Sequence, residues 1–176
     1  ARLADAIERR ERVAIFGDYD VDGATSSALM ARFFDHHETP SRIYIPDRIF
    51  EGYGPNAAAM RLLADEGATL IVTVDCGAQA FEALATAPVD VLVVDHHQCA
   101  SELPRAHAVV NPNRLDEAEG AAHGHLAAVG VAFLLGAALL REQEKTWHDW
   151  FSRADAALYR AKSAGRDNYV IADDLF

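Results

Sequence analysis

Two short and almost entirely apolar runs constrain the fold of this 176-residue chain more than any other feature. They are residues 70–74 and 91–94, LIVTV and VLVV, and polar residues bound both of them. Apolar runs of this length are typical of strands in a parallel sheet that is covered on both faces. The two runs therefore predict an α/β fold around a buried parallel sheet.

Further strands and helices are expected to alternate along the first 143 residues. The expected strands are 12–16, 42–45, 69–74, 89–94 and 108–110, and the expected helices are 24–36, 55–66, 78–87 and 126–142. Strands that alternate with helices are the pattern of successive βα units. The predicted fold class is α/β, a Rossmann-like parallel sheet with helices on both faces, followed by a C-terminal helix and a short strand.

Acidic residues directly follow three of the expected strands. They are Asp18, Asp20 and Asp22 after the first strand, Asp75 after the third, and Asp95 with His96 and His97 after the fourth. In an open parallel sheet, functional groups gather beyond the carboxyl ends of the strands. Carboxylates about 4 Å apart repel one another by about 1 to 4 kcal/mol per pair, depending on the dielectric, and a cation relieves this repulsion.

The type and number of these side chains indicate which cation they would bind. Carboxylate oxygens suit Mg²⁺ or Mn²⁺, and imidazole nitrogens favour Mn²⁺ over Ca²⁺. Five acids and two histidines are enough ligands for two ions. Two ions close together suit the hydrolysis of a phosphodiester or phosphoanhydride bond.

Each acidic motif also has a simpler interpretation. The first one fits the beginning of an EF-hand calcium loop, but Leu29 stands where that loop needs a glutamate. It could also be a solvated turn of acidic residues. Asp75 alone could belong to an ordinary turn, and the Asp95 triplet could be a polar strand end. The metal-site hypothesis rests on three strand ends that deliver ligands to one edge.

Other candidate ligands and nucleophiles receive less support. A second Asp-His-His triplet, residues 35–37, ends an expected helix, where histidines favour the helix dipole. His123 and His125 are possible further ligands. Cys76 and Cys99 are expected to be packing residues, because neither has an evident base or a positive neighbour in the sequence.

Composition restricts the classes of partner and compartment. Lys and Arg number 16 against 27 Asp and Glu, a net charge of −11, which argues against a broad basic surface that grips nucleic acid by itself. No apolar run approaches the roughly 18 residues of a membrane span, so no membrane partner is expected. Two cysteines form no disulfide framework, and the N-terminus shows no signal peptide, so a cytoplasmic location is expected.

The composition changes near residues 142–146. Residues 1–144 hold 11 Arg and 22 acidic residues, and therefore the whole charge of −11; residues 145–176 hold five residues of each sign. Both lysines and both tryptophans also lie after residue 144. We therefore expect a domain over residues 1–143 and an appendage over 144–176, with a helix at 145–164 and a strand at 169–172.

The three acidic motifs resemble those of the DHH phosphoesterase superfamily. Within it, residues 17–25, 44–48, 51–54 and 109–113 resemble the RecJ branch of single-stranded-DNA exonucleases. The resemblance covers about residues 1–143. It implies two bound Mn²⁺ or Mg²⁺ ions and a substrate of single-stranded DNA or short oligonucleotides. The implied activity is 5′ to 3′ degradation in DNA recombination and repair.

The resemblance also implies roles for individual residues. The implied metal ligands are Asp20, Asp22, Asp75 and His96, with Asp18, Asp95 and His97 as the catalytic residues beside them. Arg48 and Tyr53 fall where members of the RecJ branch contact DNA. A guanidinium suits a terminal 5′ phosphate, and an aromatic ring suits base stacking.

The sequence departs from the RecJ pattern after residue 143. The family's fourth motif, an Asp after the helix that residues 130–135 begin, has no counterpart, so one metal ligand is expected to be missing. Two alternatives therefore stand beside the nuclease: a phosphodiesterase for short oligonucleotides, and a catalytically impaired metal-binding hybrid. On the motifs at 153–162 and 165–168, about residues 145–172 resemble the last helix and strand of a GGDEF diguanylate cyclase domain, but without its signature, so cyclase activity is not implied.

Overall fold

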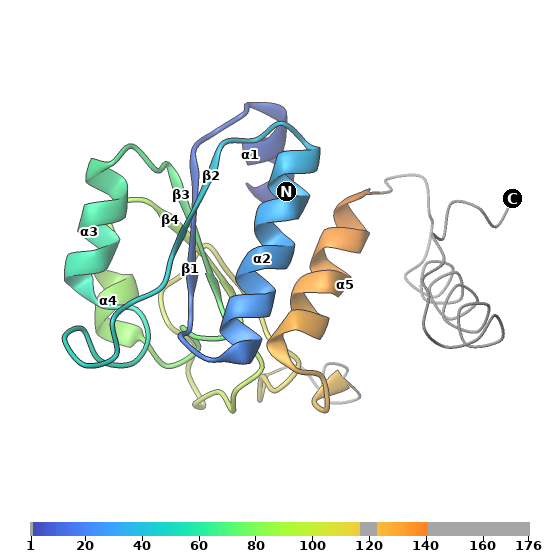
Figure 1. Ribbon diagram of the computed structural model, residues 1–176. Coiled ribbons are helices and arrows are strands. Elements are labelled where there is room, and N and C mark those ends of the chain that lie inside the picture. The colour runs from blue at the N-terminus through green and yellow to red at the C-terminus, as the bar shows by residue number, and fades with distance from the viewer. Residues whose placement is uncertain (1, 117–122, 141–176) are drawn as a thin grey trace, which may run out of the picture. The chain divides into compact units, whose positions relative to one another are not determined.

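A five-stranded parallel sheet forms the centre of the protein (Figure 1). The computed structural model describes residues 2–116 and 123–140. The strands are β1 (Val13–Gly17), β2 (Ser41–Tyr44), β3 (Leu70–Val74), β4 (Asp90–Val94) and β5 (Ala108–Val110). The helices are α1 (Arg2–Glu8), α2 (Val21–His36), α3 (Ala57–Asp65), α4 (Phe81–Ala85) and α5 (Ala128–Leu140). The predicted α/β fold is confirmed.

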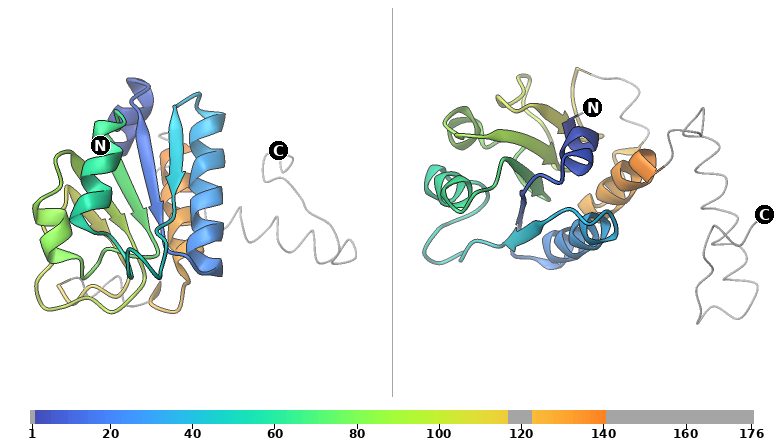
Figure 2. Two further views of the ribbon diagram at one scale, coloured as in Figure 1. Left: turned by 60° about the vertical axis from the view of Figure 1, so that its left-hand side comes forward. Right: turned by 90° about the horizontal axis from the view of Figure 1, so that it is seen from above.

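Helices cover both faces of the sheet. In Figure 2, seen from above, α3 and α4 lie on one face, while α1 and α2 lie on the other. Successive strand residues point to opposite faces, so Phe16, Ile71 and Val93 pack in one cluster with Met60 of α3. Ile15, which directly precedes Phe16 and points to the opposite face, is equally buried. This double coverage explains why the strands read as unbroken apolar runs.

The strand order creates a reversal in the middle of the sheet. The order is β2-β1-β3-β4-β5, so the chain moves outward from β1 to β2 and then returns past β1 to β3. Right-handed crossovers in opposite directions place their helices on opposite faces. Ligands of doubly wound sheets bind beyond the carboxyl ends of the strands, where the order reverses. In this chain that place is the edge beyond β1 and β3.

The register of the sheet brings the end of each strand to the same level. Gly17, Val74, Val94 and Val110 lie opposite one another in the ladder. The residues that follow them are Asp18, Asp75, Asp95 and Asn111. The N–H of each aspartate donates to the last carbonyl of the neighbouring strand, at N···O distances of 3.3, 3.0 and 3.0 Å. One transverse row of polar residues therefore crosses the carboxyl edge of the sheet.

Several element bounds differ from the prediction. Helix α1 was not predicted, because seven residues are too few for a clear helical pattern. Helix α2 begins at residue 21 because the side chain of Asp20 caps it, and α3 begins after Asn56 for the same reason. Helix α4 begins at residue 81 rather than 78, because residues 77–80 form a turn in which the Ala80 N–H donates to the carbonyl of Gly77.

Two other predictions about the first 143 residues are confirmed. The triplet at residues 35–37 closes α2, with His36 as its last residue and His37 as its C-cap. Cys76 and Cys99 are buried and unpaired, as expected of packing residues. No helix of the described residues is both long and apolar enough to cross a membrane.

The chain divides into two compact units, residues 1–134 and 135–176, and the sheet belongs to the first. The predicted helix at 145–164 and strand at 169–172 lie outside the described residues. The domain boundary near residue 143 therefore remains a prediction.

Candidate metal centre

The polar row at the carboxyl edge of the sheet is buried. Asp18, Asp75 and Asp95 expose 3%, 1% and 1% of their surface. A buried carboxylate is costly unless hydrogen bonds or a cation compensate its charge. The partners of these three side chains therefore show what each of them does.

Asp18, Asp20 and Asp75 form one group of converging carboxylates. One oxygen of each lies within 4.8 Å of the others. The exposed Asp20 accepts a hydrogen bond from the Gly23 N–H at 3.0 Å, and this bond lowers its pKa. Burial, by contrast, raises the pKa of Asp18, and the nearby charge of Asp20 raises it further.

Asp75 lies at the centre of the cluster. Burial raises its pKa to about 8, with a further contribution from the charge of Asp22 and from the neighbouring Asp20. Its backbone is also unusual, because φ is +61°. Aspartate is one of the few residues that tolerate this left-handed conformation. The conformation turns the chain at the end of β3, directly before the buried Cys76.

A second group shares Asp75 and adds imidazole nitrogens. The Nε2 atom of His96 lies 3.3 Å from an oxygen of Asp75 and 3.6 Å from an oxygen of Asp22. His97 also lies within ligand distance of Asp75 and His96. Asp75 is thus the one carboxylate common to both groups.

Asp95 orients the histidines rather than joining the carboxylate group. One of its oxygens accepts from Nδ1 of His97 at 2.8 Å and from the His96 N–H at 2.7 Å. Its other oxygen accepts from the Ala78 N–H at 2.9 Å. Desolvation lowers the pKa of His97, but the hydrogen bond and charge of Asp95 outweigh it, so the pKa is raised. The Nδ1 contact leaves the other ring nitrogen of His97 free to face a ligand.

Two asparagines that follow β5 bind the backbone of the two histidines, although neither was predicted from the sequence to be a site residue. The side-chain amide of Asn111 donates to the carbonyl of His97 at 2.9 Å, and that of Asn113 donates to the carbonyl of His96. Asn111 belongs to the polar row and is itself buried. The register of β4 and β5 could have indicated this role, because Asn111 follows β5 as Asp95 follows β4.

Aromatic rings and one arginine line the rim of the centre. The guanidinium of Arg48 lies 4.8 Å from the centre of the Tyr19 ring. Tyr53 contacts both Tyr19 and His97 edge to face, with ring centres 6.4 Å apart in each pair. Tyr53 therefore contacts a predicted catalytic residue, His97, and Arg48 contacts Tyr19, which lies between Asp18 and Asp20 in the sequence.

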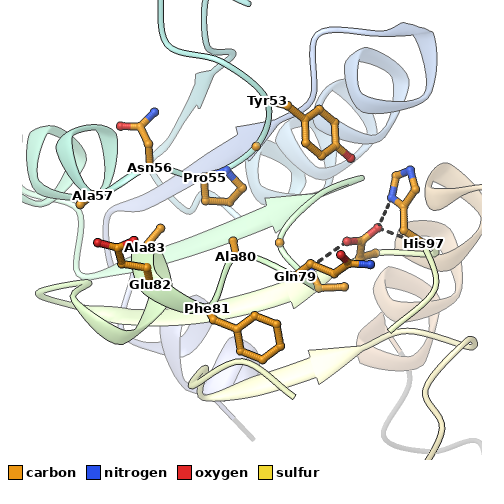
Figure 3. A pocket seen from close by; sticks show the side chains of 14 residues that line it. Tyr53, Pro55, Asn56, Ala57, Gln79, Ala80, Phe81, Glu82, Ala83 and His97 are labelled. Atoms are coloured by element: carbon orange, nitrogen blue, oxygen red, sulfur yellow. Dashed lines mark hydrogen bonds and ion pairs between the residues drawn. The ribbon is translucent and has the colours of Figure 1, made fainter. Parts of the chain in front are cut away.

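A cavity of about 610 Å³ opens beside this rim. Figure 3 shows Tyr53, Phe81 and Pro55 around it, with Asn56 and Gln79 as polar neighbours and His97 at one end. Cavities of this size and mixed lining bind small organic groups. It could hold a flat ring at the side of the carboxylate cluster.

The structure brings together the seven predicted acidic and histidine residues, but it leaves out two weaker candidates. Within the described part of the chain, the groups close enough to share an ion include neither His123 nor His125. The EF-hand interpretation also fails, because strand β1 rather than a helix precedes Asp18.

The carboxylate cluster fits divalent cations. One oxygen each of Asp18 and Asp75 is buried and accepts no hydrogen bond among the described residues, although the Asp75 oxygen lies 3.3 Å from Nε2 of His96. Buried acceptors without donors are rare because they cost free energy. A divalent ion between these oxygens and Asp20 would compensate both of them, and oxygen ligands suit Mg²⁺ or Mn²⁺.

This fold and this edge define a class: doubly wound α/β proteins with a carboxylate and histidine metal centre at the strand reversal. The sequence profile of the DHH family, N-terminal domain, matches residues 12–158. The chain belongs to the DHH family. The match extends beyond residue 143 and so overlaps the predicted appendage.

Several relatives in sequence carry the same name. The single-stranded-DNA-specific exonuclease RecJ of Bacillus subtilis is 41% identical over 146 residues, which are 80% of this chain and 18% of that protein. A crystal structure of exonuclease RecJ bound to manganese superposes with a TM-score of 0.67 and 29% identity, over 89% of this chain and 42% of that one.

A second solved structure, of RecJ in complex with Mn²⁺ from Thermus thermophilus, gives a TM-score of 0.62 and 30% identity. It covers 78% of this chain and 19% of that one. The chain thus corresponds to less than half the length of each of these three proteins.

Proposed function

We propose that the carboxyl edge of this sheet is the catalytic core of a metal-dependent phosphodiesterase that removes nucleotides from the 5′ end of single-stranded DNA. The observation that carries the proposal is the pair of buried carboxylate oxygens on Asp18 and Asp75 that accept no hydrogen bond among the described residues, within a group that Asp20 completes. The manganese-bound RecJ structures support it, because they share this fold at 29% and 30% identity.

The residues divide into two ion positions that share one ligand. Asp18, Asp20 and Asp75 would hold one ion. Asp75 and His96 would hold the other, together with Asp22, whose carboxylate lies 3.6 Å from Nε2 of His96. When bound, the two ions would activate the attacking water and neutralise the phosphoryl oxygens. Asp95 keeps His97 oriented toward the same space through the 2.8 Å contact to Nδ1.

The rim residues suit the rest of a nucleotide. Arg48 offers a planar, bidentate donor for a terminal phosphate, and Tyr53 offers a ring on which a base can stack. The cavity beside His97 has room for one base next to the metal centre. A substrate with one phosphate at the ions and one base at the rim accounts for both sets of residues.

The test is release of mononucleotides from a 5′-phosphorylated single strand in the presence of Mn²⁺. We expect activity that depends on Mn²⁺ and falls at least 100-fold in His96→Ala and in the double variant Asp20→Ala, Asp75→Ala. Leu115→Ala, at an exposed apolar residue after β5, is the matched control and should keep wild-type activity. An undiminished rate in His96→Ala would contradict the mechanism.

Substrate length separates the nuclease from a phosphodiesterase for short oligonucleotides. Both a long single strand and a dinucleotide should be tested at equal concentrations of 5′ ends. Faster turnover of the long strand supports the nuclease, and faster turnover of the dinucleotide supports the alternative. Mn²⁺ binding without turnover of either substrate supports the impaired hybrid.

We further propose that residues 144–176 are an appendage of GGDEF-like origin and that the protein acts in the cytoplasm. The change in composition after residue 144 supports the first proposal. Two buried, unpaired cysteines fit a reducing compartment. Sequencing the source DNA across codons 140–150 tests the junction.

A further inference from the structure

Asp22 makes contacts that set it apart from the other acids of the centre. One of its oxygens accepts from the N–H of Ala128 at 2.7 Å, and the other accepts from the N–H of Val129 at 2.9 Å. These two N–H groups belong to the first turn of α5, more than 100 residues away in the sequence. The side chain of Asp22 therefore caps a helix that is not its own.

The first turn of a helix has N–H groups without intrahelical partners, and its dipole favours a negative charge. Two such groups of α5 are bonded to Asp22. The Asp22 oxygen that is bonded to Ala128 also lies 3.6 Å from Nε2 of His96. The same Nε2 atom lies 3.3 Å from an oxygen of Asp75. One carboxylate therefore joins the first turn of α5 to the second ion position.

We propose that Asp22 is a positioning residue, which couples the docking of the first turn of α5 to the loading of the second ion position. Each carboxylate oxygen has two lone pairs, so an oxygen bonded to an amide can still face a cation. With both oxygens bonded to α5, the carboxylate of Asp22 is held in one orientation. A ligand that is already oriented loses less entropy when an ion binds.

Coupling of this kind is reciprocal. If the docked first turn of α5 favours the ion, the ion must favour the docked first turn by the same factor. The inference rests on the metal centre of the proposed function but not on any nucleic-acid substrate. It can therefore fail while the nuclease proposal stands, and the opposite outcome is equally possible.

The experiment is hydrogen exchange of the Ala128 and Val129 amides by NMR, with Mg²⁺ as a diamagnetic probe. In the wild type, saturating Mg²⁺ should slow exchange of both amides at least threefold. In metal-free Asp22→Asn, at least one of the two amides should exchange about tenfold faster than in the metal-free wild type, because the asparagine side chain keeps one acceptor oxygen and places its NH₂ donor against the other amide.

Asp65→Asn is the matched variant, since it also changes a carboxylate to an amide but lies at the exposed C-terminal end of α3. It should leave the metal-free exchange of both amides unchanged. Equal exchange in Asp22→Asn and wild type would overturn the proposal and leave Asp22 as a ligand only. If Asp22→Asn does not fold, the wild-type Mg²⁺ experiment decides alone: unchanged or faster exchange overturns the coupling.

Discussion

Asp75 combines three unfavourable features in a single residue. It is buried, its backbone lies in the left-handed region, and its pKa is raised to about 8. Each of these features costs stability in the metal-free protein. A cation shared by the two groups of ligands would offset the charge, which explains how such a residue can serve at the centre of a functional site.

The raised pKa predicts how the stability of the metal-free protein depends on pH. A carboxyl group whose pKa rises on folding binds more protons in the folded state than in the unfolded state. Stability should therefore fall as pH rises from 3.8, the ordinary value, to about 8, and then level off. Urea unfolding at pH 5 and pH 8 in the presence of a chelator measures this difference.

The variant Asp75→Asn should remove this contribution. Asparagine tolerates the positive φ and carries no charge, so its free energy of unfolding at pH 8 should exceed that of wild type by about 1 to 3 kcal/mol. The gain should shrink toward pH 5, where the wild-type carboxyl is protonated. A variant that keeps the full wild-type dependence on pH would contradict the assignment to Asp75.

At the level of elements, the approach of α2 to the end of β1 depends on a residue without a side chain. A Cβ atom on Gly23 would lie 2.4 Å from the carbonyl oxygen of Asp18. This contact involves backbone, which cannot rotate away. Gly23 thereby lets the first turn of α2 pass directly over Asp18, while its N–H binds Asp20.

Gly23→Ala should therefore push α2 away from the metal centre. We expect a loss of about 1 to 3 kcal/mol in the free energy of unfolding, as for an overpacked interior. Binding of Mn²⁺, measured by calorimetry, should weaken at least tenfold.

Gly130 in the first turns of α5 offers the control, because a Cβ there meets its nearest neighbour at 3.4 Å. Gly130→Ala should be neutral or stabilise by up to about 1 kcal/mol, the usual difference between the two residues in a helix. If both variants lost equal stability, the close approach at Gly23 would not be the cause.

At the level of the whole molecule, the net charge of −11 includes a metal centre made largely of carboxylates. Binding of an ion to the folded state alone stabilises that state by mass action. At a free Mn²⁺ concentration 100 times Kd, the gain should be about 2.7 kcal/mol. Thermal unfolding with and without Mn²⁺ measures it.

The double variant Asp20→Ala, Asp75→Ala removes ligands from both ion positions. Its melting temperature should not respond to Mn²⁺ at the same concentration. An equal rise of the melting temperature in wild type and double variant would show that Mn²⁺ binds elsewhere on this acidic protein, and the assigned centre would be wrong.

Much of the fold and of the centre could be predicted because the relevant signals are local. Leu70–Val74 is apolar throughout apart from Thr73, and this pattern follows from burial on both faces of the sheet. Parallel strands end at the same edge, so Asp18, Asp75 and Asp95 were expected to meet. The short α1 was missed because seven residues give no clear helical pattern, and the start of α4 was misplaced because a turn over residues 77–80 precedes it.

By itself, therefore, the sequence determined the class of fold, the edge that carries the site and the chemistry of its side chains, since these follow from periodicity and residue type. Only the tertiary structure decided what each acid does there. Strand order and register place Asn111 in one row with the three aspartates, turn Asp95 toward His97, and bring Asp22 to the first turn of α5. These contacts join segments up to 107 residues apart, and no local pattern of residues encodes a contact over that separation.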